Sequence, residues 1–246
     1  MAKKEEYGVE AIRVLKGLEP VKQRPGMYTL TDNPLHIIQE VIDNASDEVL
    51  AGYGKRISVE VAADGSVTVE DDGRGIPTGM HPEEHAPVLE IVFTRLHAGG
   101  KFAKADGSGP YTFAGGLHGV GVSVTNALSK HLVVTVWRDG QEATMGFRDG
   151  FVSEPLEIKK SSRPKSRTGT RVTVWPDPKY FDSPVIPEPA LVRLLAFSSL
   201  QSQPNSAPSG MRSGLCQQNH RDGSALEIFG RLKGISALGN QGRKSY

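Results

Sequence analysis

A glycine-rich stretch divides this 246-residue chain into two parts of different character. Eight glycines fall among the 25 residues from His97 to Gly121, too many for a helix or strand to persist there. We therefore predict a mobile loop at 97–121, which would exclude water from a site when it closes. Helical patterns dominate the sequence before this loop, and strand patterns dominate after it.

Three helices and one hairpin are predicted before the loop. The helices are expected at residues 9–16, 34–51 and 87–96. Gly17 and Gly52 would end the first two. Alternating segments at 56–61 and 66–70 flank an Ala-Ala-Asp-Gly turn and predict the hairpin. The RPGM step at 24–27 is typical of a type II turn.

After the loop, the apolar segment from Val120 predicts a helix, and strands follow at 132–137, 141–147, 152–158 and 170–175. This order predicts an α+β fold, a two-layer sandwich in which helices cover one face of a mixed sheet. We assign residues 1–197 to this domain. Residues 198–246 form a polar tail rich in Ser, Gly, Gln and Asn, which we predict to be disordered or non-native.

Charge and cysteine usage narrow the functional classes. The formal net charge is +1, but the tail from Ser198 carries six Lys/Arg against two acids, which leaves the body mildly acidic and unsuited to binding duplex DNA by itself. The single cysteine, Cys216, excludes an intrachain disulfide. No secretory signal and no apolar run of ~18 residues is present. We expect a cytoplasmic protein that does not contact a membrane.

Three polar residues share one face of the helix predicted at 34–51. Glu40, Asn44 and Asp47 are spaced i, i+4 and i+7 beside an apolar stripe. Mg²⁺ takes one or two oxygens from protein and the rest from phosphates and water, which suits the amide oxygen of Asn44. Glu40 is placed to accept a proton from, or to orient, a water aimed at a γ-phosphate. A solvated polar helix face is the commoner alternative for such a segment.

An acidic turn, DDGRGIP at 71–77, follows the second hairpin strand. A tight turn explains its second acid and first glycine. It does not explain Asp71, which would point inward if it shares a face with the two valines before it. A buried carboxylate needs a hydrogen-bond donor or must be neutral, and the N6 amine of adenine is a suitable donor. Gly75 would let the base approach, with Ile76 and Pro77 as apolar walls.

The block GGLHGVG opens a helix, where exposed N–H groups favour phosphate. It lacks the preceding strand of a dinucleotide fold and the Gly-Lys-Ser/Thr ending of a P-loop. We predict phosphate contacts from Gly115, Gly116, Leu117, His118, Gly119, Val120 and Gly121. Lys101 would reach the terminal phosphates, with an ordinary surface lysine as the alternative. The Thr168 hydroxyl could bind the base side of a nucleotide or be structural.

Six cations lie between two of the predicted strands, and a solvated loop is the favoured interpretation, with a DNA-facing loop as the alternative. They are Lys159, Lys160, Arg163, Lys165, Arg167 and Arg171.

The helix at 34–51, the acidic turn, RLHAGGKF and GGLHGVG, in this order, resemble the GHKL ATPase superfamily over roughly Tyr7 to Leu195. GLEPVKQRPGMYT and GGLHGVGVSVTNALS are similar to the B subunits of bacterial type II DNA topoisomerases. RLHAGGKF, WPDPKYFDSP and the Gln before Glu40 are more similar to the topoisomerase IV group than to the gyrase group.

The resemblance implies an ATP-binding and ATP-hydrolysing domain that uses Mg²⁺ and that drives strand passage, decatenation and relaxation of DNA in the full-length enzyme. It implies the A subunit of topoisomerase IV as a partner, a homodimer on ATP binding, and DNA contact in the full-length enzyme only. It implies that Glu40 is the base that activates water, that Asn44 is the magnesium ligand and that Asp71 contacts adenine. Tyr7 would reach the nucleotide of the partner protomer, and Arg74 and Arg138 match arginines at the pocket mouth where inhibitors bind.

Near Ala196 the sequence departs from the family, whose helix would continue into an apolar strand. We hypothesise that the tail is not native family sequence, which an intended, uninterrupted reading frame through Ser198 would disprove. The family continues into a transducer domain whose lysine touches the γ-phosphate. A dimerisation switch with little turnover by itself is therefore a second functional hypothesis. A histidine-kinase domain is a third, and it fits poorly with Glu40 as a base for water.

Overall fold

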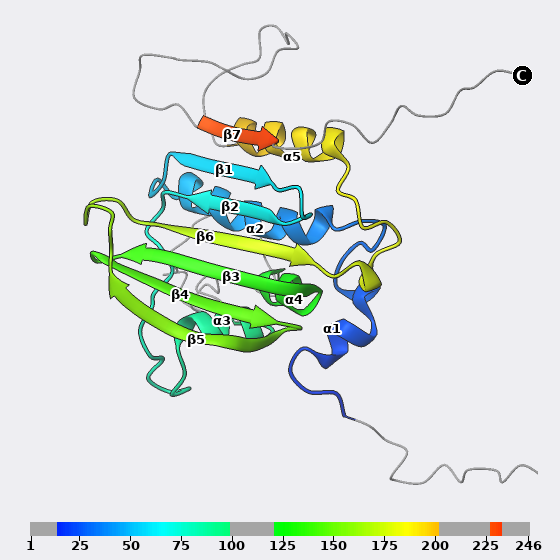
Figure 1. Ribbon diagram of the computed structural model, residues 1–246, viewed down its shortest axis with the longest axis horizontal. Helices are drawn as coiled ribbons and strands as arrows, with labels where there is room; N and C mark the ends of the chain where they lie inside the picture. Colours follow the sequence, from blue (N-terminus) through cyan, green and yellow to red (C-terminus); the bar gives the residue numbers. More distant parts are fainter. Residues whose placement is uncertain (1–13, 99–120, 202–226, 233–246) are drawn as a thin grey trace, which may run out of the picture.

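The computed structural model describes residues 14–98, 121–201 and 227–232 (Figure 1). The strands are β1 (Arg56–Val61), β2 (Val67–Asp71), β3 (Ser129–Arg138), β4 (Gln141–Arg148), β5 (Phe151–Lys160), β6 (Gly169–Pro176) and β7 (Glu227–Leu232). The helices are α1 (Glu19–Gln23), α2 (Leu35–Leu50), α3 (Val88–Thr94), α4 (Gly121–Ala127) and α5 (Glu188–Gln201), with short 3₁₀ helices η2 (Pro25–Met27) and η3 (Pro178–Tyr180).

The strands form one sheet in the order β5-β4-β3-β6-β2-β1-β7. Neighbouring strands pair antiparallel except β1 and β7, which pair parallel, so the sheet is mixed as predicted. Helices α2, α3 and α4 lie behind one face, and the opposite face carries no helix among the described residues (Figure 1). This arrangement confirms the predicted two-layer α+β sandwich.

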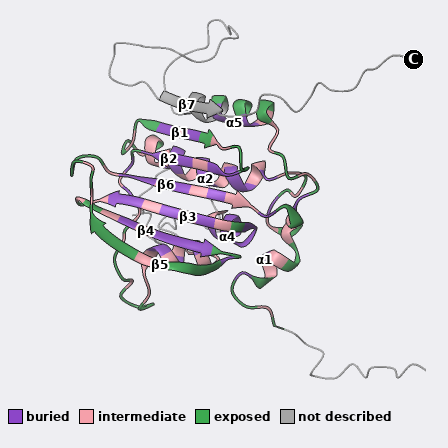
Figure 2. Cartoon of the chain, in the orientation of Figure 1, coloured by how far each residue is buried: buried purple, intermediate pink, exposed green. Residues whose placement is uncertain are grey.

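The main core lies between the sheet and its helices, where the central strands are buried most heavily (Figure 2). Ile38 and Ile42 of α2, Phe93 of α3 and Val134 and Val174 of the sheet are almost fully buried there. Each such side chain contributes about 1.5–3 kcal/mol by leaving water. This packing fixes α2 against β2 and β6, so the polar face of α2 has a defined position relative to the ends of those strands.

The long helix and the hairpin form where the sequence predicts them. Helix α2 ends one residue before Ala51, and Gly52 follows with φ +80°, the left-handed conformation that glycine adopts without strain. The hairpin strands β1 and β2 pair over Ile57 to Val61, and Gly65 in their turn has φ +82°. The helices α3 and α4 and the four later strands also occupy the predicted segments.

The N-terminal predictions differ from the structure. Residues 14–16 are not helical, and residues 9–13 lie outside the described residues. The helix α1 instead begins after Gly17, because Pro20 in its first turn has a backbone already set for a helix start. The RPGM step forms η2, in which the N–H of Tyr28 donates to the carbonyl of Pro25. Gly26 lacks the positive φ that a type II turn requires.

The predicted boundary after residue 197 falls inside α5, which continues to Gln201. Residues 227–232 of the predicted tail form β7 along β1, whose edge would otherwise present unpaired backbone groups. The division of the chain into 1–197 and 198–246 stays a prediction, and residues 99–120 of the predicted loop lie outside the described residues. Within the described ranges, no helix is long and apolar enough to cross a membrane.

Candidate functional site

The polar face of α2 carries Glu40, Asn44 and Asp47 on successive turns. The side-chain amide nitrogen of Asn44 donates to the backbone carbonyl of Glu40 at 2.8 Å. The oxygen and nitrogen of an amide point in different directions from the same carbon. Because the nitrogen faces the helix backbone, the Asn44 carbonyl oxygen is turned away from it. Asp47 is buried, with 1% of its surface exposed. Glu40 and Asn44 are only partly buried.

Glu40 lies against the first residue of α4. A Cβ placed on Gly121 would be 2.0 Å from the Oε2 atom of Glu40, an approach that only glycine permits. The two helices are joined by Thr125, whose hydroxyl donates to the backbone carbonyl of Ile37 at 2.8 Å. The Glu40 carboxylate, which we predict to activate water, therefore lies beside Gly121, the residue at which the predicted phosphate-binding block GGLHGVG leads into α4.

This contact between Glu40 and Gly121 can be tested directly. If Glu40 activates water for ATP hydrolysis, as the family resemblance implies, Gly121→Ala should lower that hydrolysis by about tenfold, because the new methyl group displaces the Glu40 carboxylate from its position. Alanine is itself favourable in a helix, so the melting temperature should change little. Gly79→Ala is the matched control, since a Cβ there meets no atom within 4 Å. Equal hydrolysis by both variants in a steady-state assay would contradict the role of this contact.

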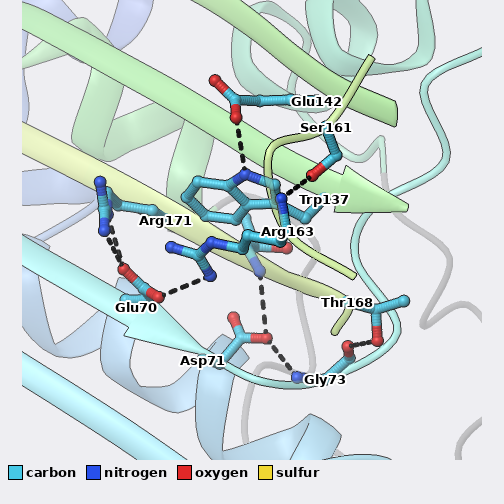
Figure 3. Close-up of polar contacts among 10 residues, drawn as sticks. Glu70, Asp71, Gly73, Trp137, Glu142, Ser161, Arg163, Thr168 and Arg171 are labelled. Carbon is cyan, nitrogen blue, oxygen red and sulfur yellow. Dashed lines mark hydrogen bonds and ion pairs between the residues drawn. The ribbon is translucent and has the colours of Figure 1, made fainter. Parts of the chain in front are cut away.

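Asp71 points into the protein, as the alternation of β2 predicts, and 9% of its surface is exposed. Its Oδ1 atom accepts hydrogen bonds from the backbone N–H of Gly73 at 2.9 Å and of Thr170 at 3.3 Å. Both donors address the same oxygen, as Figure 3 shows. Both hydrogen bonds end on Oδ1, so the other carboxylate oxygen, Oδ2, is a suitable acceptor for an amine of a ligand.

Burial raises the pKa of Asp71 to about 7, because the charged carboxylate loses its hydration there. The N–H of Gly73 lowers this pKa, and the nearby carboxylate of Glu48 raises it. The adjacent Asp72 is exposed, and its Oδ1 atom accepts the backbone N–H groups of Lys55 and Arg56 at 2.7 Å each. One acid of the pair therefore faces the interior, and the other fixes the start of β1.

Close backbone packing places the acidic turn between α2 and β3. A Cβ on Gly73 would lie 2.8 Å from the Cβ of Glu48 on α2, one turn beyond Asn44. Gly75 has φ +75°, and a Cβ there would lie 2.9 Å from the backbone oxygen of Trp137. Helix α2 thus contacts Gly121 through Glu40 and the turn after Asp71 through Glu48. It connects the predicted phosphate end of the site with the predicted base end.

An ion pair that was not predicted from the sequence closes this turn. Arg74 Nη2 lies 2.8 Å from Glu48 Oε1, and the Arg74 Nε and backbone N–H donate to Glu48 Oε2. The guanidinium also stacks on the ring of Tyr53, 3.6 Å from its centroid. The signal for Glu48 was available, since it follows Asn44 by four residues on the same helix face. Arg138 Nη1 donates to the Gly75 carbonyl at 2.8 Å.

Thr168 belongs to the same constellation. Its hydroxyl donates to the backbone carbonyl of Gly73 at 2.6 Å (Figure 3). Ile76 is partly buried and packs against the main core, whereas Pro77 is exposed. The structure therefore brings the turn and Thr168 together.

Other predicted site residues lie outside the described residues: Tyr7, Lys101, Gly115, Gly116, Leu117, His118, Gly119 and Val120.

A hollow of about 420 Å³ lies elsewhere, on the sheet face that α2, α3 and α4 leave uncovered. Residues of β1, β2 and β6 line it, including Glu70 and Arg171. Since neighbouring residues of a strand point to opposite faces, the Glu70 side chain and this hollow lie across β2 from Asp71. The hollow is therefore not the predicted nucleotide site.

Comparison with known proteins gives consistent matches. Residues 30–180 match the family model described as histidine kinase-, DNA gyrase B-, and HSP90-like ATPase. The B subunit of DNA topoisomerase 4 from Pseudomonas aeruginosa is 54% identical over 177 residues, which cover 72% of this chain and 27% of that protein. The B subunit of DNA gyrase from Thermus thermophilus is 51% identical over 178 residues, which cover 71% of this chain and 27% of that protein.

Two solved structures share the fold. The ATP-binding domain of Francisella tularensis topoisomerase IV, in complex with a small-molecule inhibitor, has a TM-score of 0.63 and 46% identity, and the match covers 74% of this chain and 47% of that one. The 43K ATPase domain of Thermus thermophilus gyrase B, in complex with an aminocoumarin, has a TM-score of 0.65 and 40% identity, with 78% and 48% covered.

Proposed function

Because the chain belongs to the histidine kinase-, DNA gyrase B- and HSP90-like ATPase family, we propose that its α2 face and Asp71 turn bind ATP for hydrolysis. The main support for this proposal is that α2 contacts both α4 and the turn after Asp71. Glu40 touches the first residue of α4, and Glu48 touches the turn that holds Asp71 inward. A nucleotide that spans this helix face would have its base at one end and its phosphates at the other.

Each end offers the chemistry that its ligand group needs. The Oδ2 atom of Asp71 would accept the adenine amine, while Oδ1 stays occupied by the Gly73 and Thr170 N–H groups. Residues 115–121 would bind the phosphates through backbone N–H groups. Glu40 would orient a water molecule and take its proton as it attacks the γ-phosphate. Thr168 would hydrogen-bond the base side.

The residues present fit a magnesium ion bound together with ATP. Among the described residues, no group of three or more His, Cys, Asp or Glu could hold a metal alone. Mg²⁺ at a nucleotide needs only one or two protein oxygens, and the Asn44 amide is turned so that its oxygen faces away from α2. The ion would neutralise charge on the phosphates. Asn44 would orient it without adding negative charge.

Nucleotide titration beside a steady-state ATPase assay on this chain tests the proposal. We expect saturable ATP binding that requires Asp71 and magnesium-dependent release of phosphate. Binding with negligible turnover would favour the dimerisation switch over the hydrolysing domain. Absence of ATP binding at millimolar concentration would contradict both.

The chain spans 27% of the length of the Pseudomonas aeruginosa relative, so the activity of a whole enzyme is a separate proposal. We propose that the domain serves the B subunit of a cytoplasmic topoisomerase IV, with gyrase as the alternative. There it would act with the A subunit and DNA, form a homodimer on ATP binding through the arm that carries Tyr7, and drive strand passage. The arginines Arg74 and Arg138 would face inhibitors at the pocket mouth.

A further inference from the structure

Four side chains on the sheet face opposite α2, α3 and α4 form a cluster that the proposed function does not use. We name it the outer clamp, and it consists of Glu70, Trp137, Arg163 and Arg171 (Figure 3). Glu70 pairs with Arg163 Nη1 at 2.9 Å through one oxygen and with Arg171 Nε at 2.6 Å through the other. The Arg163 guanidinium lies 3.5 Å from the centroid of the Trp137 ring, and Trp137 is 4% exposed.

The outer clamp closes the end of a strand pair. Glu70 and Arg171 form the last partners of the ladder between β2 and β6. Beyond them the two chain segments meet through Thr170, whose N–H donates to Asp71, and through Thr168, whose hydroxyl donates to the Gly73 carbonyl. The approach is tight, since a Cβ on Gly169 would lie 2.1 Å from the Asp71 backbone oxygen.

Arg163 anchors the segment that carries Thr168 and leads directly into Gly169 and Thr170 at the start of β6. It lies in residues 161–168, between β5 and β6, and its backbone N–H donates to the Ser161 hydroxyl at 2.9 Å. Its side chain holds the segment onto β2 through Glu70 and onto β3 through Trp137. The residue after Trp137 is Arg138, which donates to the Gly75 carbonyl. The outer clamp therefore ties together the three backbone stretches around Asp71.

Resting on the proposed function, we propose that Arg163 is a positioning residue for base recognition. By fixing segment 161–168 on the outer face, it keeps Thr168 and the Thr170 N–H against the turn that carries Asp71. Hydrolysis should depend on it little, because Glu40 and Gly121 meet two turns of α2 away from Glu48. The expected effect is thus on nucleotide affinity and base preference rather than on turnover at saturation.

Equilibrium titration with ATP and GTP tests this role. Arg163→Ala should raise the Kd for ATP by about three- to tenfold and reduce the preference for ATP over GTP, with kcat within about twofold of wild type. Arg163→Lys keeps a cation beside Glu70 but loses the planar group that stacks on Trp137, so it should recover only part of the affinity and bind ATP more tightly than Arg163→Ala does. Arg167→Ala removes the same charge from an exposed position of the same segment and should bind ATP as wild type does. Melting temperatures verify that each variant is folded.

The outcomes separate this inference from the function on which it rests. If wild type and Arg167→Ala bind ATP well and Arg163→Ala binds it equally well, the positioning role is wrong and the proposed function stands. A fall in kcat without a change in Kd or base preference would also overturn the role. Wild-type protein that binds no ATP would overturn the proposed function, and the inference with it.

Discussion

Replacing Glu40 by glutamine should lower steady-state ATP hydrolysis by about a thousandfold while the Kd for ATP stays within about threefold of wild type. Glutamine preserves the shape of the side chain beside Gly121 but cannot take a proton from water. The bond from the Asn44 amide survives, because its acceptor is the Glu40 backbone carbonyl. Phosphate release measures the hydrolysis, and titration with a non-hydrolysable analogue measures the affinity.

A matched substitution controls for the loss of one negative charge. Glu83→Gln removes a carboxylate from an exposed loop position and should leave hydrolysis unchanged. The Glu40→Ala variant should lose hydrolysis to the same extent as Glu40→Gln, since both lack the proton acceptor. Hydrolysis by either Glu40 variant at the wild-type rate would refute the assignment of this residue as the base.

Asp71→Asn should weaken ATP binding by about 10- to 100-fold and narrow the preference for ATP over GTP. The asparagine oxygen can still accept from Gly73 and Thr170, which directs its amide N–H₂ toward the base. An amine there opposes the adenine N6 donor but suits a guanine carbonyl. Titrations with ATP and GTP at pH 8 measure both affinities. An equal loss for both nucleotides would count against base recognition by Asp71.

The buried carboxyl of Asp71 leads us to expect two pH dependences. With its pKa raised to about 7, Asp71 gains its charge between pH 6 and 8, so wild-type affinity for ATP should increase over that range and the Asp71→Asn affinity should not. The unfolded chain releases this proton near the ordinary value of 3.8, whereas the folded protein keeps it to about 7. The free energy of unfolding should therefore fall as pH rises from about 3.8 to about 7, because over this range the folded state binds more protons than the unfolded chain.

An asparagine in place of Asp71 carries no such proton, so the substitution removes that fall. At pH 8 the Asp71→Asn variant should unfold with a free energy about 1–3 kcal/mol higher than wild type. Urea denaturation at pH 5 and pH 8 measures the difference, and Asp182→Asn at an exposed position serves as the control. A variant that is less stable than wild type at pH 8 would contradict the burial of a charged Asp71.

The predictions that succeeded rest on short-range periodicity. Glu40 and Asn44 share a helix face because a helix repeats every 3.6 residues, and Asp71 faces inward because a strand alternates every two. Both rules hold within one element, so the sequence alone was sufficient. The failures at the N-terminus were also local. Pro20 starts a helix where Gly17 was expected to end one, since the two residues favour opposite ends of helices.

The contacts that join the elements were not predictable in this way. Arg163 and Glu70 are 93 residues apart in the sequence, and Arg171 and Glu70 are 101 apart. Their pairing depends on the placement of β6 beside β2, which no local pattern specifies. The cations at 159–171 were accordingly predicted to form a solvated loop. The register between the two strands places Arg171 opposite Glu70, and the Trp137 ring supplies a surface for Arg163.

A crystal structure of this chain with a non-hydrolysable ATP analogue and magnesium tests the central claim most directly. We expect the adenine amine within about 3.2 Å of the Asp71 carboxylate and the metal within about 2.2 Å of the Asn44 oxygen. The γ-phosphate should lie on the Glu40 side of α2. An analogue bound away from α2, or one that contacts Asn44 while its base lies far from Asp71, would contradict the assignment of this helix face as the nucleotide site.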